Sequence, residues 1–206
     1  MITSDQPPAP HVELTTATGL TVRVRQARPQ DGPALQAGFE HLSDDSRYTR
    51  FFTAVPKLSG SLLRQLTDID GGHTFAFAVF DPRRPSEVGS EDGYGIGVAR
   101  WIRTKADPTV AELAIAVIDS YHGHRLGSLL MTGLVVSAHV HGITALSAFV
   151  LATNQAMINL LLRLGAERQT AEPGEYAVAS YLLGVDTAWA ALAADPATIE
   201  AFRSIS

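Results

Sequence analysis

The stretch that decides the fold runs from residue 110 to residue 137 and reads VAELAIAVIDSYHGHRLGSLLMTGLVVS. It predicts a strand over Val110–Ile118, a tight connector from Asp119 to about His124, and an amphipathic helix that reaches about His141. A glycine-containing turn at the start of a helix leaves backbone N–H groups without partners at the positive end of the helix dipole. The connector is therefore expected to bind a phosphate or a diphosphate.

The chain around this stretch alternates between strands and helices. Strands are expected at 21–26, 74–80, 94–103, 143–151, 167–171 and 176–183, and helices at 34–42, 58–66, 154–164, from 186 and from 195. Residues 42–52 begin with polar residues that suit helix caps and end on Phe51 and Phe52, which we expect in the core. The central strand is apolar on both faces except at Glu112, so we expect it to be covered on both sides. A three-strand meander feeds a β-α-β unit, which requires a mixed sheet.

Composition excludes several classes of function. A net charge of −5 argues against a general nucleic-acid binder, and the absence of cysteine excludes disulfides, thiolate metal sites and a cysteine nucleophile. His73, His139 and His141 lack the spacing of metal ligands, so no metal is expected. Residues 1–11 read as a flexible tail without the layout of a signal peptide, and no apolar run reaches the roughly 20 residues of a membrane span. We expect a cytoplasmic protein without membrane partners.

Two motifs and the order of elements resemble the GCN5-related N-acetyltransferase (GNAT) superfamily over roughly residues 20–185. That family has an Arg/Gln-x-x-Gly-x-Gly/Ala turn before a helix; here Gly127 fits, whereas His122 and Arg125 depart from the pattern. An asparagine that opens the following helix matches better, with Asn154, Met157, Leu160, Leu164 and Gly165 at the family's spacing. Residues 42–52 and 111–114 are most similar to the branch that contains bacterial protein-lysine acetyltransferases.

The resemblance implies an α/β fold with a mixed, splayed sheet of six to seven strands, about four flanking helices and an extra C-terminal helical tail. It divides the chain into a tail (1–11), an acetyltransferase domain (12–185) and a C-terminal helical extension (186–206). The terminal apolar residues would pack on the domain or on a second copy, so both a monomer and a homodimer are open.

The resemblance also implies the activity of an acetyl-CoA-dependent N-acetyltransferase, in which a primary amine attacks the thioester directly. The amine would belong to a protein lysine or to a small molecule, and acetyl-CoA would be the co-substrate. Its diphosphate would lie on the connector, and its pantetheine arm along the central strand. The implied cofactor-binding residues are Ile115, Ala116, Val117, His122, Gly123, His124, Arg125, Leu126, Gly127, Ser128 and Asn154. Arg125 can present its N–H to phosphate if its dihedral angles are helical.

Glu112 is the candidate general base because it is the only charged residue within the central strand. A lysine amine with a pKa of about 10.4 needs about 4.6 kcal/mol to be neutral at pH 7, so a base is useful. The structural alternative is a Glu112 carboxylate paired with Arg100. Tyr48 and Arg50 are candidates for contact with the acceptor.

Many members of the superfamily carry a tyrosine acid seven residues after the helix-opening asparagine, where this chain has Leu161. The thiolate would then take its proton from water or from another residue, with Tyr121 and Tyr176 as candidates. Leu161 and Arg125 also motivate an alternative function, a CoA-binding sensor or regulatory domain without turnover.

Overall fold

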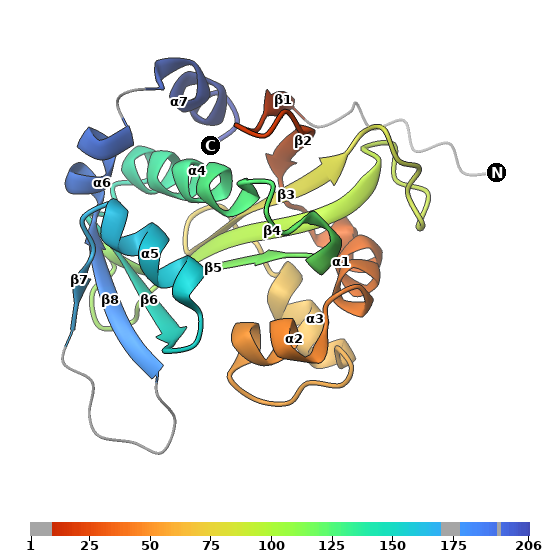
Figure 1. Ribbon diagram of the computed structural model, residues 1–206, viewed down its shortest axis with the longest axis horizontal. Helices are drawn as coiled ribbons and strands as arrows, with labels where there is room; N and C mark the ends of the chain where they lie inside the picture. Colours follow the sequence, from red (N-terminus) through yellow and green to blue (C-terminus); the bar gives the residue numbers. More distant parts are fainter. Residues whose placement is uncertain (1–9, 170–177, 193–194) are drawn as a thin grey trace.

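The computed structural model describes residues 10–169, 178–192 and 195–206, which form one mixed sheet with helices on both faces (Figure 1). The strands are β1 (His11–Thr15), β2 (Thr21–Gln26), β3 (Thr74–Asp81), β4 (Tyr94–Arg103), β5 (Val110–Val117), β6 (Ala145–Leu151), β7 (Glu167–Arg168) and β8 (Val178–Gly184). The helices are α1 (Gly32–Glu40), α2 (Asp44–Phe51), α3 (Gly60–Thr67), α4 (Leu126–Val140), α5 (Gln155–Arg163), α6 (Val185–Leu192) and α7 (Pro196–Arg203).

The eight strands that the described residues contribute lie in the order β1-β2-β3-β4-β5-β6-β8-β7. Only β5 and β6 are parallel, as the β-α-β unit requires, and the other neighbours are antiparallel. The mixed sheet is confirmed and is slightly larger than predicted, because β1 begins at His11, within the stretch assigned to the tail. This edge strand alternates half-buried Val12 and Leu14 with exposed residues, and it is too short to give a strong periodic signal.

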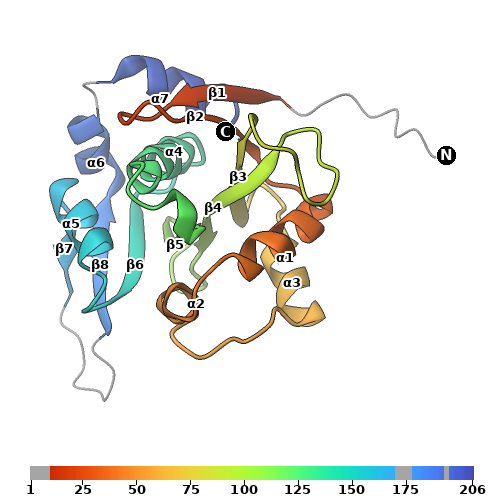
Figure 2. The same ribbon diagram turned by 45° about the vertical axis from the view of Figure 1, so that its right-hand side comes forward.

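The two faces of the sheet are covered by different helices, as Figure 2 shows. Helices α1, α2 and α3 lie on one side, and α4 and α7 lie on the other. Helix α2 was not expected as a separate element. It forms because the Ser43 side chain accepts a hydrogen bond from the Ser46 amide, and two acidic residues follow in the first turn, where the helix dipole favours negative charge.

Helix α4 is held against the sheet by a nearly continuous apolar surface and by one polar contact. Leu130, Leu134 and Trp101 are fully buried. The indole Nε1 of Trp101 donates to the Ser137 hydroxyl at 2.9 Å, which satisfies both polar groups inside the core. This contact fixes the rotation of α4 about its axis, and so it also fixes the direction in which the N-terminus of the helix faces.

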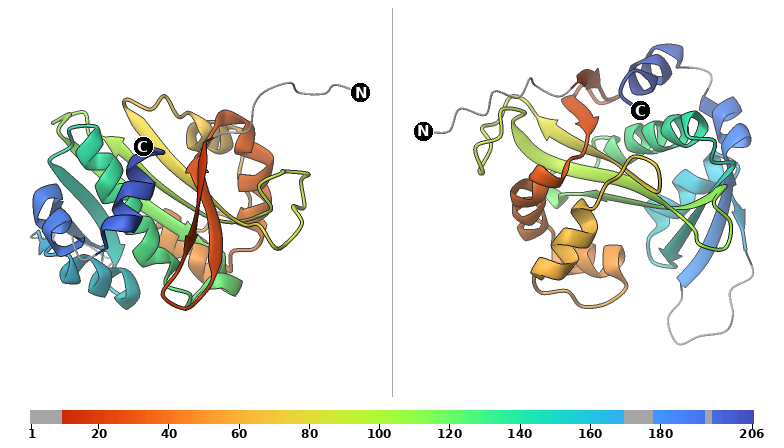
Figure 3. Two further views of the ribbon diagram at one scale, coloured as in Figure 1. Left: turned by 90° about the horizontal axis from the view of Figure 1, so that it is seen from above. Right: turned by 180° about the vertical axis from the view of Figure 1, so that it is seen from behind.

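The predicted C-terminal helices are present as α6 and α7. Phe202 of α7 is fully buried, with its ring 5.2 Å from that of Phe77, and it occupies the space beside Gly133 on α4. Figure 3 shows α7 beside the β1–β2 hairpin, with which it is in contact. The division of the chain at residue 186 stays a prediction.

Candidate active site

The sheet opens between its two parallel strands. The β5–β6 ladder contains only the pairs Val110–Ala145, Ala111–Leu146 and Glu112–Ser147, although both strands continue beyond them. From there the strands diverge around a cleft of about 780 Å³, within the usual range for a ligand site. The splayed sheet that the sequence predicts is therefore confirmed, and the opening begins at Glu112.

The cleft brings together almost all of the predicted site residues. Glu112, Arg50 and every predicted cofactor-binding residue except His124 line it. His124 is exposed, and its backbone carbonyl accepts a hydrogen bond from the Thr18 hydroxyl at 3.2 Å. Tyr48 is half-buried and does not line the cleft.

The connector places backbone amides at the mouth of the cleft. Arg125 has φ 61° and ψ 15°, so the condition of right-handed helical dihedral angles for presenting its N–H to phosphate is not met. It adopts the left-handed conformation that costs a non-glycine residue roughly 1–2 kcal/mol and that glycine takes freely. The amides of Ser128 and Leu129 both donate to the Arg125 carbonyl. The amides of Leu126 and Gly127, the first two residues of α4, have no acceptor within the helix and remain for an anion.

His122 occupies the first position of the family turn and links the connector to the end of β5. Its Nε2 lies 2.9 Å from the Val117 carbonyl oxygen. Since a carbonyl only accepts, Nε2 carries the hydrogen. The other ring nitrogen, Nδ1, lies 3.6 Å from Oδ1 of Asp119. The Val117 carbonyl thus has a partner within the chain. Because β4 pairs with this part of β5, only the backbone groups on the opposite edge of β5 remain for a ligand.

Asp119 joins the connector to the start of α2. One carboxylate oxygen accepts from the Ser46 hydroxyl, and the other accepts from the Ser43 amide. Burial by itself raises the pKa of Asp119, but the hydrogen bonds from Ser46 and Ser43 and the nearby His122 outweigh it, so the pKa lies below its ordinary value. This carboxylate therefore fixes one wall of the cleft to the other.

Replacing Asp119 with Asn is expected to change how stability depends on pH. Because the folded state lowers the pKa of this carboxyl, its contribution is fully present above the unfolded pKa of about 3.9 and is lost as the pH falls through the lower folded value. The wild type should be more stable than Asp119→Asn near neutral pH, and the difference should shrink below about pH 4. Urea unfolding of both proteins between pH 6 and pH 3 measures this, and parallel curves across that range would refute it.

Asn154 has one of the two roles that its position suggested, the helix cap, and its contact with a pantetheine arm stays a prediction. Its side-chain oxygen accepts from the Met157 amide at 3.1 Å and so caps α5. The side chain lines the cleft, and its NH₂ group has no hydrogen-bond partner among residues 10–169, 178–192 and 195–206. That donor remains for a carbonyl group in the cleft.

Glu112 lies at the point where the strands part, and it is exposed. The expectation that β5 is covered on both faces holds only in part: β5 contacts α4 on one face, where Ala111 and Leu113 are buried, and α2, but Ala114 on the opposite face is half-buried. In the described part of the chain, no carboxylate lies within ion-pair distance of Arg100, which instead donates to the Leu66 carbonyl at 3.3 Å. The alternative of a Glu112–Arg100 ion pair is therefore not realised.

Two arginines, the half-buried Arg50 and the buried Arg100, interact electrostatically with Glu112. Burial and repulsion from Arg100 lower the pKa of Arg50 to about 10, against the attraction of Glu112. Burial likewise lowers the pKa of Arg100, opposed by Glu112 and Asp68. A guanidinium still carries its charge at neutral pH under these conditions, so this side of the cleft is positive.

Tyr121, the candidate acid that lies within the described residues, makes hydrogen bonds to other side chains. The Tyr121 hydroxyl donates to Asp81 at 2.7 Å and accepts from Arg84 at 3.3 Å. Burial raises the pKa of Tyr121, and the hydrogen bond to Asp81 raises it further. Leu161 is fully buried in the core, and Tyr176 lies outside the described residues.

Sequence reasoning missed several residues that line the cleft. From α2 these include Asp45, Ser46 and Thr49, whose spacing of three and four places them on the same face as Arg50. Phe52, which we expected in the core, is 38% exposed and lines the cleft, because it ends α2 in the left-handed conformation. Helix α5 adds Asn159, Leu160 and Arg163. The spacing on α2 was the available signal, but that segment was not recognised as a helix.

The described residues contain neither a cluster of metal ligands nor a helix that could span a membrane. No group of three or more His, Asp or Glu side chains there could hold a metal ion. None of the helices seen there is both long and apolar enough to cross a membrane.

Comparisons with known proteins agree with this geometry. The family model of the acetyltransferase (GNAT) domain matches residues 21–167. Acetyltransferase Pat of Mycolicibacterium smegmatis is 32% identical over 157 residues, which are 75% of this chain and 44% of Pat. The chain thus spans less than half the length of this curated relative.

Solved structures match the same fold. The GNAT domain of S. lividans PAT has a TM-score of 0.73 at 25% identity, and the match covers 84% of this chain and 96% of that domain. A cAMP-binding acyltransferase from Mycobacterium smegmatis has a TM-score of 0.57 at 27% identity, and the match covers 96% of this chain and 56% of that one. With a family model over most of its length and a sheet that splays beside a diphosphate-type turn, the chain belongs to the GNAT acetyltransferase family.

Proposed function

We propose that the protein transfers an acetyl group from acetyl-CoA to a primary amine of a protein lysine or a small molecule, with Glu112 as the general base. The observation that carries this proposal is the end of the β5–β6 ladder at Glu112. It puts a carboxylate in the same cleft as the amides of a helix N-terminus.

The residues of the cleft fit acetyl-CoA. The amides of Leu126 and Gly127 suit a diphosphate, because helix N-termini bind anions. Beyond Glu112, β6 no longer pairs with β5, so the backbone polar groups on that edge need another partner. The amide groups of a pantetheine arm supply such partners, and the free NH₂ of Asn154 adds a donor. When bound, acetyl-CoA supplies the activated thioester.

The chemistry then falls to groups of this chain. Glu112 takes a proton from the ammonium form of the acceptor, directly or through one water, which frees the lone pair of the nitrogen. A bond forms between that nitrogen and the thioester carbon, and the carbon–sulfur bond breaks. A backbone N–H near Ala116 or Val117 stabilises the negative charge that develops on the carbonyl oxygen. The nitrogen loses its second proton as the amide forms, and that proton passes through water to the departing thiolate, since the Tyr121 hydroxyl already donates to Asp81.

The test supplies acetyl-CoA with a panel of small amines and lysine peptides and follows the release of CoA thiol, while calorimetry measures the binding of CoA. We expect saturable binding together with turnover of at least one amine. Binding without turnover of any amine would favour the alternative, a CoA-binding sensor, which Leu161 in the core and Arg125 in the glycine position both motivate. The absence of binding would refute both functions.

A further inference from the structure

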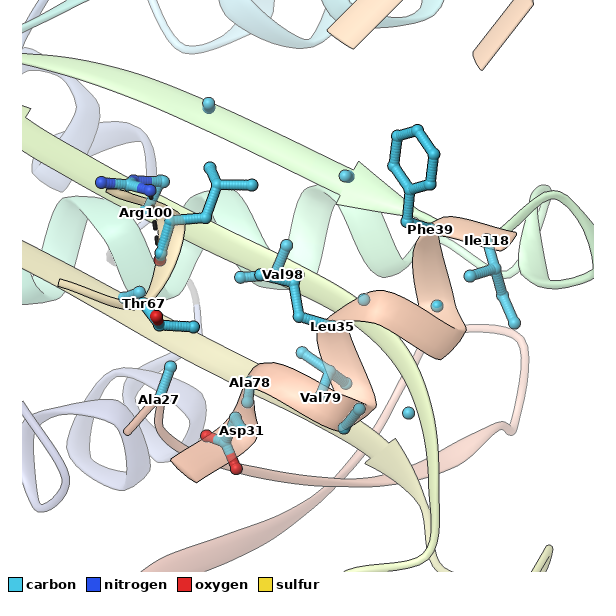
Figure 4. Close-up of a pocket in the computed structure, with 18 of the residues that line it drawn as sticks. Ala27, Asp31, Leu35, Phe39, Thr67, Ala78, Val79, Val98, Arg100 and Ile118 are labelled. Carbon is cyan, nitrogen blue, oxygen red and sulfur yellow. Dashed lines mark hydrogen bonds between the residues drawn. The ribbon is translucent and has the colours of Figure 1, made fainter. Parts of the chain in front are cut away.

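A second, smaller cavity adjoins the cleft on the side of α1 and α3. We name it the inner compartment; it measures about 100 Å³ and is shown in Figure 4, where Val98, Leu35 and Phe39 line it and Arg100 lies toward one end. It shares four wall residues with the cleft. These are Leu42, Arg50, Ala114 and Ala116. The two cavities therefore meet along the segment of β5 next to which the thioester would lie.

The walls of the inner compartment are made largely of small and apolar residues. Ala114 and Ala116 of β5 and Gly95 and Gly97 of β4 leave the space open, and Leu35 of α1 faces it from the other side. The compartment is thus shaped for a short aliphatic group. Its small volume excludes a long chain.

Charge distinguishes this cavity from an ordinary packing defect. Arg100 is 5% exposed, and its Nε has no hydrogen-bond partner among the residues that the structure describes. Arg50 lies over the Phe51 ring at 5.0 Å, and within the same set of residues it makes no hydrogen bond or ion pair. Arg100 is thus a poorly solvated cation that a second, half-buried cation repels, which is unfavourable unless an anion accompanies them.

The carboxylates within the described parts of the chain do not supply that anion. Glu112 and Asp68 attract these arginines electrostatically, but neither lies within 4.0 Å of one among the described ion pairs. Asp31 also lines the compartment, but it is bound to Arg25 at 2.7 Å. The compartment therefore carries an excess of positive charge next to apolar walls.

We propose that the inner compartment binds a short aliphatic group that ends in a carboxylate, with the carboxylate between Arg50 and Arg100. This inference rests on the proposed acyl transfer and names its substrate class. The group reaches the compartment from one of two sources. It is the acyl chain of a dicarboxylic donor such as succinyl-CoA, or it is the carboxylate arm of an amino-acid acceptor. The transfer itself is unchanged. The bond between the amine nitrogen and the carbonyl carbon forms, the carbon–sulfur bond breaks, and Glu112 takes the proton of the ammonium group.

The experiment has one arm for each source. In the donor arm, kcat/KM is measured for succinyl-CoA and for butyryl-CoA, which has the same chain length without the carboxylate, using one neutral amine. In the acceptor arm, acetyl-CoA is fixed, and β-alanine is compared with its amide. We expect the carboxylate to be preferred by about tenfold or more in one arm, as for a charge-assisted hydrogen bond.

Variants connect that preference to the two arginines. Arg50→Met and Arg100→Met should each reduce the preference for the carboxylate substrate to below about threefold. Arg50→Lys, which keeps the charge, should retain part of this preference. Arg64→Met is the matched control: Arg64 lies on α3, is exposed and does not line either cavity, so the preference should persist. Circular dichroism verifies that each variant is folded.

Turnover of neutral substrates with no preference in either arm would overturn the inference and leave the proposed function intact. If no substrate turns over, the proposed function fails, and calorimetric titration still decides the inference. A carboxylate ligand, succinyl-CoA against butyryl-CoA or β-alanine against its amide, that binds the wild type at least about tenfold more tightly, with the difference lost in Arg100→Met, would support it. Equal binding within both pairs would overturn it.

Discussion

Glu112→Gln is expected to lower kcat for acetyl transfer by about 10²-fold or more while leaving the affinity for CoA nearly unchanged. Glutamine has the size of glutamate but cannot accept a proton from the ammonium group. The amides to which we propose that the diphosphate binds belong to the start of α4, which this substitution does not touch. Thiol release under saturating acetyl-CoA measures the rate, and calorimetry with CoA measures the affinity.

Glu167→Gln serves as the control, because Glu167 is an exposed carboxylate on β7 that does not line the cleft. Its rate should stay within about twofold of the wild type. The pH profile gives a second readout, since the loss of the base should remove the acidic limb of kcat/KM. A Glu112→Gln variant that keeps more than a tenth of the wild-type rate would exclude Glu112 as the base.

Phe202→Ala is expected to lower the free energy of unfolding by about 3–5 kcal/mol, the range for truncating a buried aromatic side chain. Phe202 is fully buried, packs edge-on against Phe77 at 5.2 Å, and lies so close to Gly133 that a β-carbon there would overlap its ring. The substitution leaves a cavity between α7, α4 and the sheet, which the rigid elements around it fill only in part. Urea unfolding followed by circular dichroism measures the change.

Glu200→Ala on the same helix is the matched control. Its side chain is 71% exposed, so stability should change by less than about 0.5 kcal/mol. If Phe202→Ala costs less than about 1 kcal/mol, α7 does not contribute to the core as its burial indicates.

The sequence predicts well those parts of the site whose local sequence pattern favours the same structure that tertiary packing imposes. The run from Val110 combines a continuous apolar strand, a glycine-containing turn and a helical periodicity. Each of these patterns can be recognised from the local sequence, without knowledge of the residues that pack against it. Asn154 caps α5 by accepting from the amide of Met157, three residues along the chain. The start of this helix could therefore be predicted from neighbouring residues alone.

The parts that the sequence did not predict depend on distant residues. Helix α2 is short and strongly polar, and Asp119, more than 70 residues away, anchors its first turn. Phe52 is exposed because the cleft opens beside it, which depends on the end of the β5–β6 ladder. The same opening exposes Glu112. An apolar run predicts burial, but it does not reveal on which face of a strand the neighbouring layer is interrupted.

The left-handed backbone of Arg125 has a consequence for how such turns are recognised in genomes. A search that demands glycine at this position would pass over the chain, although its main chain bends there as glycine allows. The backbone dihedral angles, rather than the residue type, define this turn. An arginine at this position brings its own positive charge to the cleft. Sequence searches that also accept polar residues able to adopt this conformation would recover relatives that a search for glycine alone discards.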